Sequence, residues 1–532
     1  MKYRFAIVII LLSLSIFSFI PSNVNSDVGQ GQCARSEITN DTKWFNDRGI
    51  DQPENWINMP SAMRFGIYTY VVWQGGTGFV PCIARYNHVT GLWGDSIQLA
   101  NSNPIAGDGH GAPTVFITPS GKILITYGAH ISALKYIRGD VSTYPSGFVT
   151  MSDIISVATY PHFTYLTSSN RIFMAFRSGD ACSAWNFMIS NNDGTTWTAG
   201  GNFLQVASYV GGVKVGDDGA SIYFEFATLP NCSTDTVTRQ NAYIVYYLPD
   251  NGNAFWCKTV LGDTQIGFVV SAPIPVVCRL EVATSANFGD VVKLGGALQT
   301  GGNVYVSYSI GTSIPVGTWQ YRFAIWNGTV WNINTISYGD HFQDYNDFRV
   351  KAADDVDAYV LSNATDFSGS KEGGILDLYH WNGASWNYNQ TILSPNQTGG
   401  NLLTAPFVPQ NGQDEVFFDE RVISLTVANS KLYLWNTYTG FEGLTFIPSA
   451  FFGGGIRTES ILLILIFIAL FVAGLKWPIF WIFSVVSGFL SAAFLFRDIQ
   501  SVAVSAMISG VCLLITALLI GKLLSNEALG SG

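Results

Sequence analysis

The chain has 532 residues, a formal net charge of −10, 14% aromatic residues and only 12% charged residues. This length exceeds one ordinary domain, and the acidic balance without a basic patch argues against a nucleic-acid-binding protein. We expect a large β-rich body joined to membrane segments, with no nucleic-acid partner.

The N-terminus has the layout of a secretory signal. Lys2 and Arg4 precede the apolar run 5–20, and small or polar residues follow up to about Ser26. This order predicts a signal peptide over residues 1–26 and export of the segment that follows. An uncleaved anchor is the competing interpretation, and the proline and Ser/Asn run after the apolar stretch argue against it.

Cysteine and asparagine motifs agree with an extracellular body. Of seven cysteines, Cys512 lies in an apolar tail, and an even number remains in a compartment where disulfides persist. These are Cys33, Cys82, Cys182, Cys232, Cys257 and Cys278. We expect some to be bridged, and the lack of close CxxC pairs makes a zinc site the weaker interpretation. We predict no cofactor and leave a structural metal ion open.

Six Asn-x-Ser/Thr sequons suit a surface glycoprotein. They begin at Asn40, Asn231, Asn327, Asn363, Asn389 and Asn396. Some sequons arise by chance in a chain rich in Asn and Thr, so their number alone does not establish the compartment.

Short strand-like runs recur after a polar extension at 27–60, most of them roughly fifty residues apart. They are Arg64–Val72, Lys122–Tyr127, Arg171–Arg177, Ser221–Phe226, Asn303–Tyr308, Ala358–Ser362 and Lys431–Trp435. A turn followed by tryptophan returns with the same period, in Asn87–Trp93, Ser190–Trp197, Asp250–Trp256, Trp326–Trp331 and Trp381–Trp386. Such periods are typical of propeller blades, because a blade buries both faces only by stacking on its neighbours.

We therefore predict an all-β fold, a seven-bladed β-propeller over residues 61–450, in which the wide gaps 226–303 and 362–431 are long inter-strand loops. A pair of sandwiches or a β-helix is the alternative, and neither explains the regular period as well.

The composition changes abruptly after Gly455. The nearly uncharged runs at about 460–475, 479–496 and 499–521 predict three transmembrane helices within residues 458–524. They contain no ionisable residue, so we expect an anchor and not a transport path. Lys476 and Lys522 fall on the cytoplasmic side if the propeller is extracellular, which agrees with the positive-inside rule and places the C-terminus in the cytoplasm.

The run from Gly107 to Arg138 contains the first candidate site residues. Strands are expected at Thr114–Thr118 and Lys122–Tyr127, with His110 just before the first and His130 just after the second. Antiparallel strands of similar length bring those two ends together, so the imidazoles should lie side by side.

A second pair has the same spacing one blade further along the chain. Tyr160 is expected just before a strand, and Arg177 ends the next one. These two side chains should converge with His110 and His130 on one rim. Each of the four taken alone is better explained as packing or a solvated side chain, as are His88, His162, His341 and His380.

The motifs His110-Gly-Ala-Pro, Tyr-Gly-Ala-His130, Tyr160-Pro and Phe-Arg177-Ser-Gly resemble the BNR-repeat (Asp-box) propeller family that includes the seven-bladed ulvan-type polysaccharide lyases. The segment Ser190–Trp197 is similar to an Asp-box with Asn192 in place of the usual Asp. The resemblance covers the first four blades and implies that the two histidines, the tyrosine and the arginine form the active site.

The implied chemistry is β-elimination on a uronic acid. Arg177 would neutralise the carboxylate, His110 and Tyr160 would transfer protons, and His130 would orient or donate. The acidic polysaccharide would be bound where the cleft is made locally positive by Lys135, Arg138 and Lys214. A sialidase is less well supported because an early Arg-Ile-Pro motif is absent. A non-catalytic glycan-binding adhesin or receptor-binding propeller is the main alternative.

Overall fold

The computed structural model describes residue 33, residues 46–49 and most of residues 59–436. The gaps in the last range are 77, 106–107, 181–182, 206–207, 229–239, 250–253, 260–261, 272–273, 276–277, 282–291, 312–315, 342–345, 363–373, 395–400, 410–414 and 423–429. These residues belong to one unit, Met1–Tyr438, whereas a second unit, Thr439–Gly532, lies outside the described residues.

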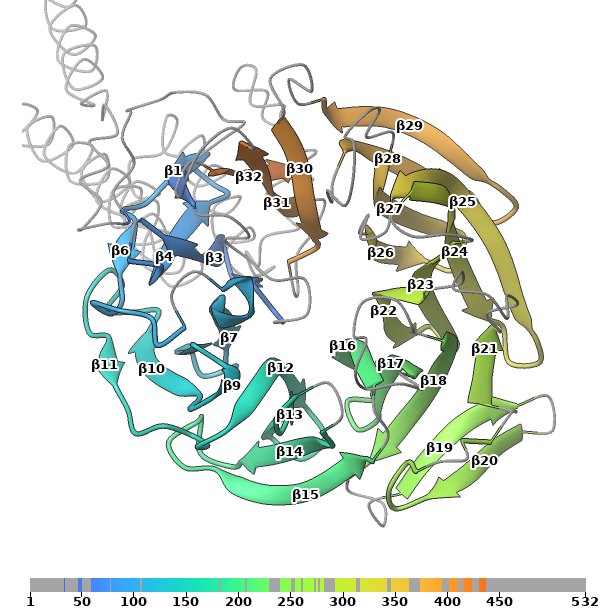
Figure 1. Ribbon diagram of the computed structural model, residues 1–532, viewed down its shortest axis with the longest axis horizontal. Helices are drawn as coiled ribbons and strands as arrows, with labels where there is room; N and C mark the ends of the chain where they lie inside the picture. The colour runs from blue at the N-terminus through green and yellow to red at the C-terminus, as the bar shows by residue number, and fades with distance from the viewer. Residues whose placement is uncertain are drawn as a thin grey trace, which may run out of the picture. The chain divides into compact units, whose positions relative to one another are not determined.

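Short antiparallel strands form seven blades around a ring (Figure 1). Blade 1 contains β2 (Ala62–Phe65), β3 (Tyr68–Gly75), β4 (Val80–Asn87), β5 (Leu92–Trp93) and β6 (Ile97–Gln98). Blade 2 contains β7 (Thr114–Ile117), β8 (Lys122–Tyr127), β10 (Lys135–Asp140) and β11 (Val149–Thr150). Blade 3 contains β9 (His130–Ser132), β12 (Ala158–Leu166), β13 (Arg171–Arg177), β14 (Trp185–Ser190) and β15 (Thr198–Leu204).

The remaining four blades continue around the ring. Blade 4 contains β16 (Ser208–Val215), β17 (Ile222–Thr228), β18 (Gln240–Leu248), β19 (Ala254–Thr259), β20 (Gly262–Gly267) and β21 (Arg279–Glu281). Blade 5 contains β22 (Val292–Thr300), β23 (Asn303–Gly311), β24 (Val316–Trp326) and β25 (Trp331–His341). Blade 6 contains β26 (Asn346–Ala352), β27 (Asp355–Ser362), β28 (Ile375–Trp381) and β29 (Trp386–Leu393). Blade 7 contains β30 (Asn401–Phe407), β31 (Glu415–Val422), β32 (Ser430–Asn436) and β1 (Asn46–Gly49).

Strand β1, from the stretch expected as an N-terminal extension, closes the ring. It pairs antiparallel with β32, with Asn46 opposite Leu432, and it also pairs with β3 of blade 1. The buried carboxylate of Glu415 in blade 7 has the Thr69 hydroxyl of blade 1 at 2.9 Å from each oxygen. Ring closure therefore joins segments from opposite ends of the propeller sequence.

The regular strand repeat is confirmed with two corrections. The predicted strands of blades 2 to 6 match β8, β13, β17, β23 and β27, each the second strand of its blade when the three-residue β9 at the edge of blade 3 is not counted. The predicted strand Arg64–Val72 is wrong, because a turn at Gly66, with φ of +60°, divides it into β2 and β3. The predicted seventh strand is β32, the third of its blade, and the second is β31.

The prediction that the two wide gaps are loops is wrong. The 226–303 gap contains β18 to β22, because blade 4 carries the additional strands β20 and β21. The 362–431 gap contains β28 to β31. It is wide because its two ends are not equivalent strands: β27 is the second strand of blade 6, whereas β32 is the third strand of blade 7.

The turn-and-tryptophan repeat is confirmed for the four turns that the structure describes, which join the outer strand pairs β4–β5, β14–β15, β24–β25 and β28–β29. The fifth predicted turn begins at 250–253, outside the described residues, and its tryptophan lies on β19. In the turn that follows Ser190, the backbone N–H of Gly194 donates to the Ser190 hydroxyl at 2.9 Å. The Asn192 side chain accepts from the N–H of Thr196 at 2.9 Å. An amide oxygen thus replaces the carboxylate of the usual Asp-box.

The core lies between the blades. On β13, every residue after Arg171 is buried, whichever face of the sheet it occupies. Phe173, for example, stacks on Phe187 of its own blade with ring centroids 4.9 Å apart. It also packs edge-to-face against Phe224 of blade 4, with ring centroids 6.1 Å apart. Full burial of such a side chain contributes about 1.5–3 kcal/mol, so neighbouring blades stabilise each other.

The expected disulfides are present at Cys33–Cys82 and Cys257–Cys278. Cys182, Cys232 and Cys512 lie outside the described residues, as do the predicted signal peptide and the three predicted transmembrane segments. Within the described part of the chain, no helix has the length and apolarity to cross a bilayer.

Candidate active site

A tight turn before β7 places His110. Asp108 precedes the 3-10 turn η2 (Gly109–Gly111), and its carboxylate accepts from the backbone N–H of His110 at 2.9 Å. A Cβ on Gly111 would lie 2.6 Å from the Ile105 side chain, so any larger residue there would displace that side chain. The same carboxylate also contacts Nδ1 of His110, which fixes the imidazole relative to its own turn.

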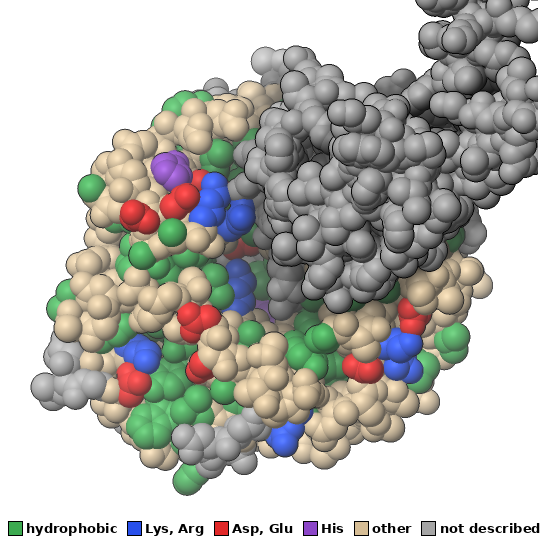
Figure 2. Space-filling model, turned by 180° about the vertical axis from the view of Figure 1, so that it is seen from behind, with side chains coloured by type: hydrophobic (Ala, Val, Ile, Leu, Met, Phe, Trp, Pro, Cys, Tyr) green, Lys and Arg blue, Asp and Glu red, His purple; other side chains and the backbone are tan. Residues whose placement is uncertain are grey.

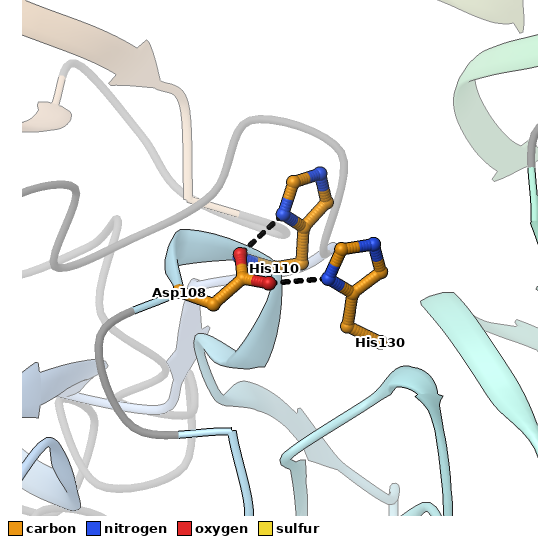
Figure 3. Close-up of side chains that lie close together, drawn as sticks. All are labelled: Asp108, His110 and His130. Atoms are coloured by element: carbon orange, nitrogen blue, oxygen red, sulfur yellow. Dashed lines mark hydrogen bonds and ion pairs between the residues drawn. The ribbon is translucent and has the colours of Figure 1, made fainter.

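The second oxygen of Asp108 contacts Nδ1 of His130, the first residue of β9. The two imidazole rings stack with centroids 4.0 Å apart and planes 18° from parallel. Figure 3 shows both Nδ1 atoms facing the carboxylate and both Nε2 atoms pointing away from it. Because a carboxylate accepts only from a protonated nitrogen, this arrangement leaves the Nε2 atoms to exchange protons with a substrate.

The carboxylate of Asp108 is held in its charged form. Its partial burial raises the pKa, but hydrogen bonds from His110 and His130 outweigh that effect and place the pKa well below its usual range. A permanent negative charge therefore lies behind both imidazoles.

Tyr160 adds a phenol beside this pair. Its ring centroid lies 5.3 Å from that of His110 and 6.4 Å from that of Trp185. The expectation that Tyr160 precedes a strand is wrong, since it lies inside β12, at an irregularity in the pairing with β13. Its φ of +57° is a conformation that non-glycine residues rarely adopt, and strained positions of this kind cluster at functional sites.

Arg177, at the end of β13, completes the cluster. The carbon at the centre of its guanidinium lies 4.7 Å from the centroid of the Tyr160 ring, and its Nε donates to the carbonyl of Gly179 at 3.3 Å. Arg177 is 2% exposed and Tyr160 is 1% exposed, whereas the side chains of His110 and His130 remain about one-third exposed.

Thr159 connects the two halves of the site. In the sheet it lies opposite His130 of β9 on one side and Arg177 of β13 on the other. Its hydroxyl accepts from the backbone N–H of Ile131 at 3.0 Å and donates to the carbonyl of Gly179 at 3.1 Å. The expected convergence of two imidazoles, a phenol and a guanidinium is thus found, spread over blades 2 and 3.

The three cations expected to bind substrate are placed differently. Lys135 pairs with Asp153 at 2.8 Å, and Lys214 lies 3.8 Å from the buried carboxylate of Asp347. Arg138 lies on β10, and no described contact joins it to the cluster. On the face seen in Figure 2, basic side chains lie beside acidic ones and form no continuous basic patch. The substrate-binding role of these residues stays a prediction.

Asp108 and Thr159 were not singled out in the sequence. The available signal was the position of Asp108 two residues before His110, because an Asp at the start of a tight turn commonly accepts from the backbone N–H two residues on. The role of Thr159 depends on sheet register and has no local signal.

Two groups of side chains have donor sets that suit a metal ion. Asp108, His110 and His130 bring ligand atoms within 4.8 Å of one another, as do Asp355, Asp357 and His380. In the second group the ammonium of Lys351 lies 2.6 Å from Asp357 and already balances its charge. In the first, two imidazoles and a carboxylate form a set suited to zinc or iron.

The chain is similar in sequence to known lyases over part of its length. It is 30% identical over 183 residues to "Ulvan Lyase-PL25" of Pseudoalteromonas sp. (strain PLSV), which covers 30% of this chain and 37% of that protein. It is 26% identical over 183 residues to an ulvan lyase of Alteromonas sp. (strain LOR), with 31% and 38% covered. The chain thus spans less than half the length of the curated relatives it matches.

The fold is similar to that of solved lyases over most of the propeller. A PL25 ulvan lyase bound to -[GlcA(1-4)Rha3S]- superposes with a TM-score of 0.61 at 20% identity, covering 74% of this chain and 95% of that one. The polysaccharide lyase Uly1 gives a TM-score of 0.51 at 13% identity, covering 71% and 89%. At these identities the likeness shows the fold alone.

A family model described as a BNR repeat-containing family member matches residues 68–338, a range that includes all four predicted site residues. Because this match covers just over half of the chain and coincides with the observed blades, the chain belongs to the BNR repeat-containing family.

Proposed function

We propose that the protein is a polysaccharide lyase that cleaves uronate-containing polymers by β-elimination. The observation that carries the proposal is the pair of imidazoles held on Asp108 with Tyr160 and Arg177 beside them. Proton removal, proton donation and carboxylate neutralisation require these residue types, and sequence similarity to named ulvan lyases supports the same reaction class.

The reaction removes one proton from C5 of the uronic acid and adds one proton to the oxygen that leaves C4. Nε2 of neutral His110, or the phenolate oxygen of an ionised Tyr160, takes the proton from C5 of the uronic acid while Arg177 stabilises the charge that develops on the carboxylate. The C5 electron pair forms a C4–C5 double bond, the C4–O bond breaks, and the departing oxygen takes the Nε2 proton of His130 in its imidazolium form. The products are a new reducing-chain end and an unsaturated uronate.

The test is to incubate the full-length protein with a panel of uronate polymers and to follow the absorbance of the unsaturated product. Tyr160→Phe retains the ring between His110 and Arg177 and should lower kcat by about 10²-fold or more without changing the thermal midpoint. Tyr165→Phe, on the same strand with its hydroxyl near Asn170, is the matched control and should keep full activity. Absence of product from every polymer contradicts the proposal.

A glycan-binding protein without catalysis is the second candidate. The observation that favours it is the burial of Tyr160 and Arg177, since a covered guanidinium contacts a substrate carboxylate only after rearrangement. Retained polymer binding by the wild-type protein, with no unsaturated product, would support this candidate.

We further propose attachment to the cell surface, with the propeller outside. The supporting features are the signal-like residues 1–26 and the apolar runs within 458–524, which the sequence alone provides. Full-length protein should sediment with membranes, and a variant ending at residue 452 should be soluble. Soluble full-length protein would exclude the anchor.

A further inference from the structure

Ile131 has a backbone conformation that branched residues avoid. Its φ is +54°, in the left-handed region. Six non-glycine residues in the described part of the chain have positive φ, and Ile131 is the β-branched one among them. The branched side chain clashes with the backbone in this region, so the conformation costs folding free energy.

Hydrogen bonds on both sides hold the strained residue. The N–H of Ile131 donates to the Thr159 hydroxyl at 3.0 Å, and the N–H of His130 donates to the Ser132 hydroxyl at 3.1 Å. The Ser132 hydroxyl in turn donates to the carbonyl of Gly128. Strain persists where the surrounding structure over-determines the backbone, and such positions concentrate in functional sites.

Packing does not account for the isoleucine. Ile131 is 53% exposed, and it belongs to none of the apolar clusters formed by the described residues. Ile131 follows His130 directly in the chain, so the two Cα atoms are about 3.8 Å apart. The imidazole of His130 stacks on that of His110. An exposed apolar group therefore adjoins a site made of polar side chains.

We propose that Ile131 contacts substrate and selects for it, by covering an apolar face of the sugar unit bound beside His130. The inference rests on the proposed function of the site and adds a property of its substrate. The matching sugar presents C–H or methyl groups at this position, because a hydroxyl or sulfate placed against the isoleucine would lose hydration without gaining a partner.

The test compares Ile131→Gly and Ile131→Asn with the wild-type full-length protein. Glycine and asparagine tolerate positive φ, so both variants should unfold at a temperature about 1–2 °C higher. Loss of the apolar contact should raise KM for the polymer by about five- to tenfold. The Kd measured by isothermal titration calorimetry should rise by the same factor, whereas kcat should change less than twofold.

Two substitutions provide matched controls. Asn170→Gly changes another residue with positive φ, at 53°, in the turn between β12 and β13. Val149→Ala removes another exposed branched side chain, 58% exposed on β11. Neither should change KM or Kd.

The possible results separate this inference from the lyase proposal. An active wild-type enzyme whose Ile131 variants keep KM and Kd overturns the inference and leaves the lyase intact. A wild-type protein that binds polymer without cleaving it, and binds less well after Ile131→Gly, supports the contact and overturns the lyase. A protein that neither binds nor cleaves any uronate polymer overturns both.

Discussion

At the residue scale, the site depends on one carboxylate that serves two imidazoles. Asp108 uses one oxygen for His110 and the other for His130, and it also accepts from the backbone of its own turn. A carboxylate behind an imidazole sets both the ring orientation and the nitrogen that carries the proton. The two rings are therefore positioned as a pair.

Asp108→Asn should test this pairing. An amide offers one acceptor and one donor group, so it can satisfy the Nδ1–H form of one imidazole only and forces the other into a different tautomer. We expect kcat/KM on uronate polymer to fall by about 10²-fold with little change in KM, and the ring nitrogen NMR signals of one histidine to change tautomer.

Asp153→Asn is the control for the charge change, since that carboxylate pairs with Lys135 near the surface. It should retain activity. An Asp108→Asn enzyme with wild-type kcat and unchanged ring nitrogen signals would show that the shared carboxylate does not position the imidazoles.

At the scale of the element, β12 combines a strained position with a buried histidine. Tyr160 interrupts the regular pairing with β13, and His162, two residues on, is fully buried with its ring 5.5 Å from that of Trp185. Burial lowers the pKa of His162 to about 3. The folded protein therefore keeps this imidazole neutral under conditions in which the unfolded chain protonates it.

His162 should make the propeller sensitive to acid. The unfolded imidazole binds a proton below about pH 6.5 and the folded one does so only near pH 3, so stability falls as the pH drops through this interval. Between pH 7 and pH 5 the wild-type protein should lose about 2 kcal/mol more of unfolding free energy than His162→Leu. Urea unfolding at the two pH values measures the difference, and equal losses would refute the assignment.

The Asp-box turn of blade 3 offers a second test at this scale. Asn192 accepts from the N–H of Thr196 and donates to its hydroxyl, both at 2.9 Å. Asn192→Ala should cost about 1 kcal/mol in denaturant unfolding, whereas Asn192→Asp, which restores the usual residue, should stay within about 0.5 kcal/mol of the wild type. A cost for Asp equal to that for Ala would show that the acceptor oxygen is not what stabilises the turn.

At the scale of the whole molecule, the ends of the propeller sequence are tied together near blade 1. Strand β1 completes blade 7 and contacts blade 1, and the disulfide Cys33–Cys82 fastens the preceding segment to β4. This bond closes a loop with a sequence separation of 49 residues. Such a loop restricts the unfolded chain strongly.

Replacing both cysteines, in Cys33→Ser with Cys82→Ser, should lower the free energy of unfolding by about 4 kcal/mol in the chain-entropy account of cross-links. Denaturant unfolding of oxidised wild-type and double-variant proteins measures this loss. An unchanged midpoint would mean that β1 pairing alone secures the N-terminal segment.

The sequence by itself determined the blades and the neighbouring imidazoles. Strand alternation, turn residues and the recurring tryptophan are local patterns, and the β7–β8 hairpin brings His110 and His130 to the same end. Where the local pattern was ambiguous, as in blade 7 and in the enlarged blade 4, the predicted strand or loop was wrong.

Only the tertiary structure decided how the ring closes and how the site is held. Thr69 and Glu415 are 346 residues apart in sequence, and no local signal connects them. The register that places Thr159 between His130 and Arg177, and the left-handed backbone of Tyr160 and Ile131, likewise depend on contacts between strands. Local propensity specifies that a segment forms a strand, whereas contacts with neighbouring strands select its register. The same contacts offset the free-energy cost of the left-handed backbone.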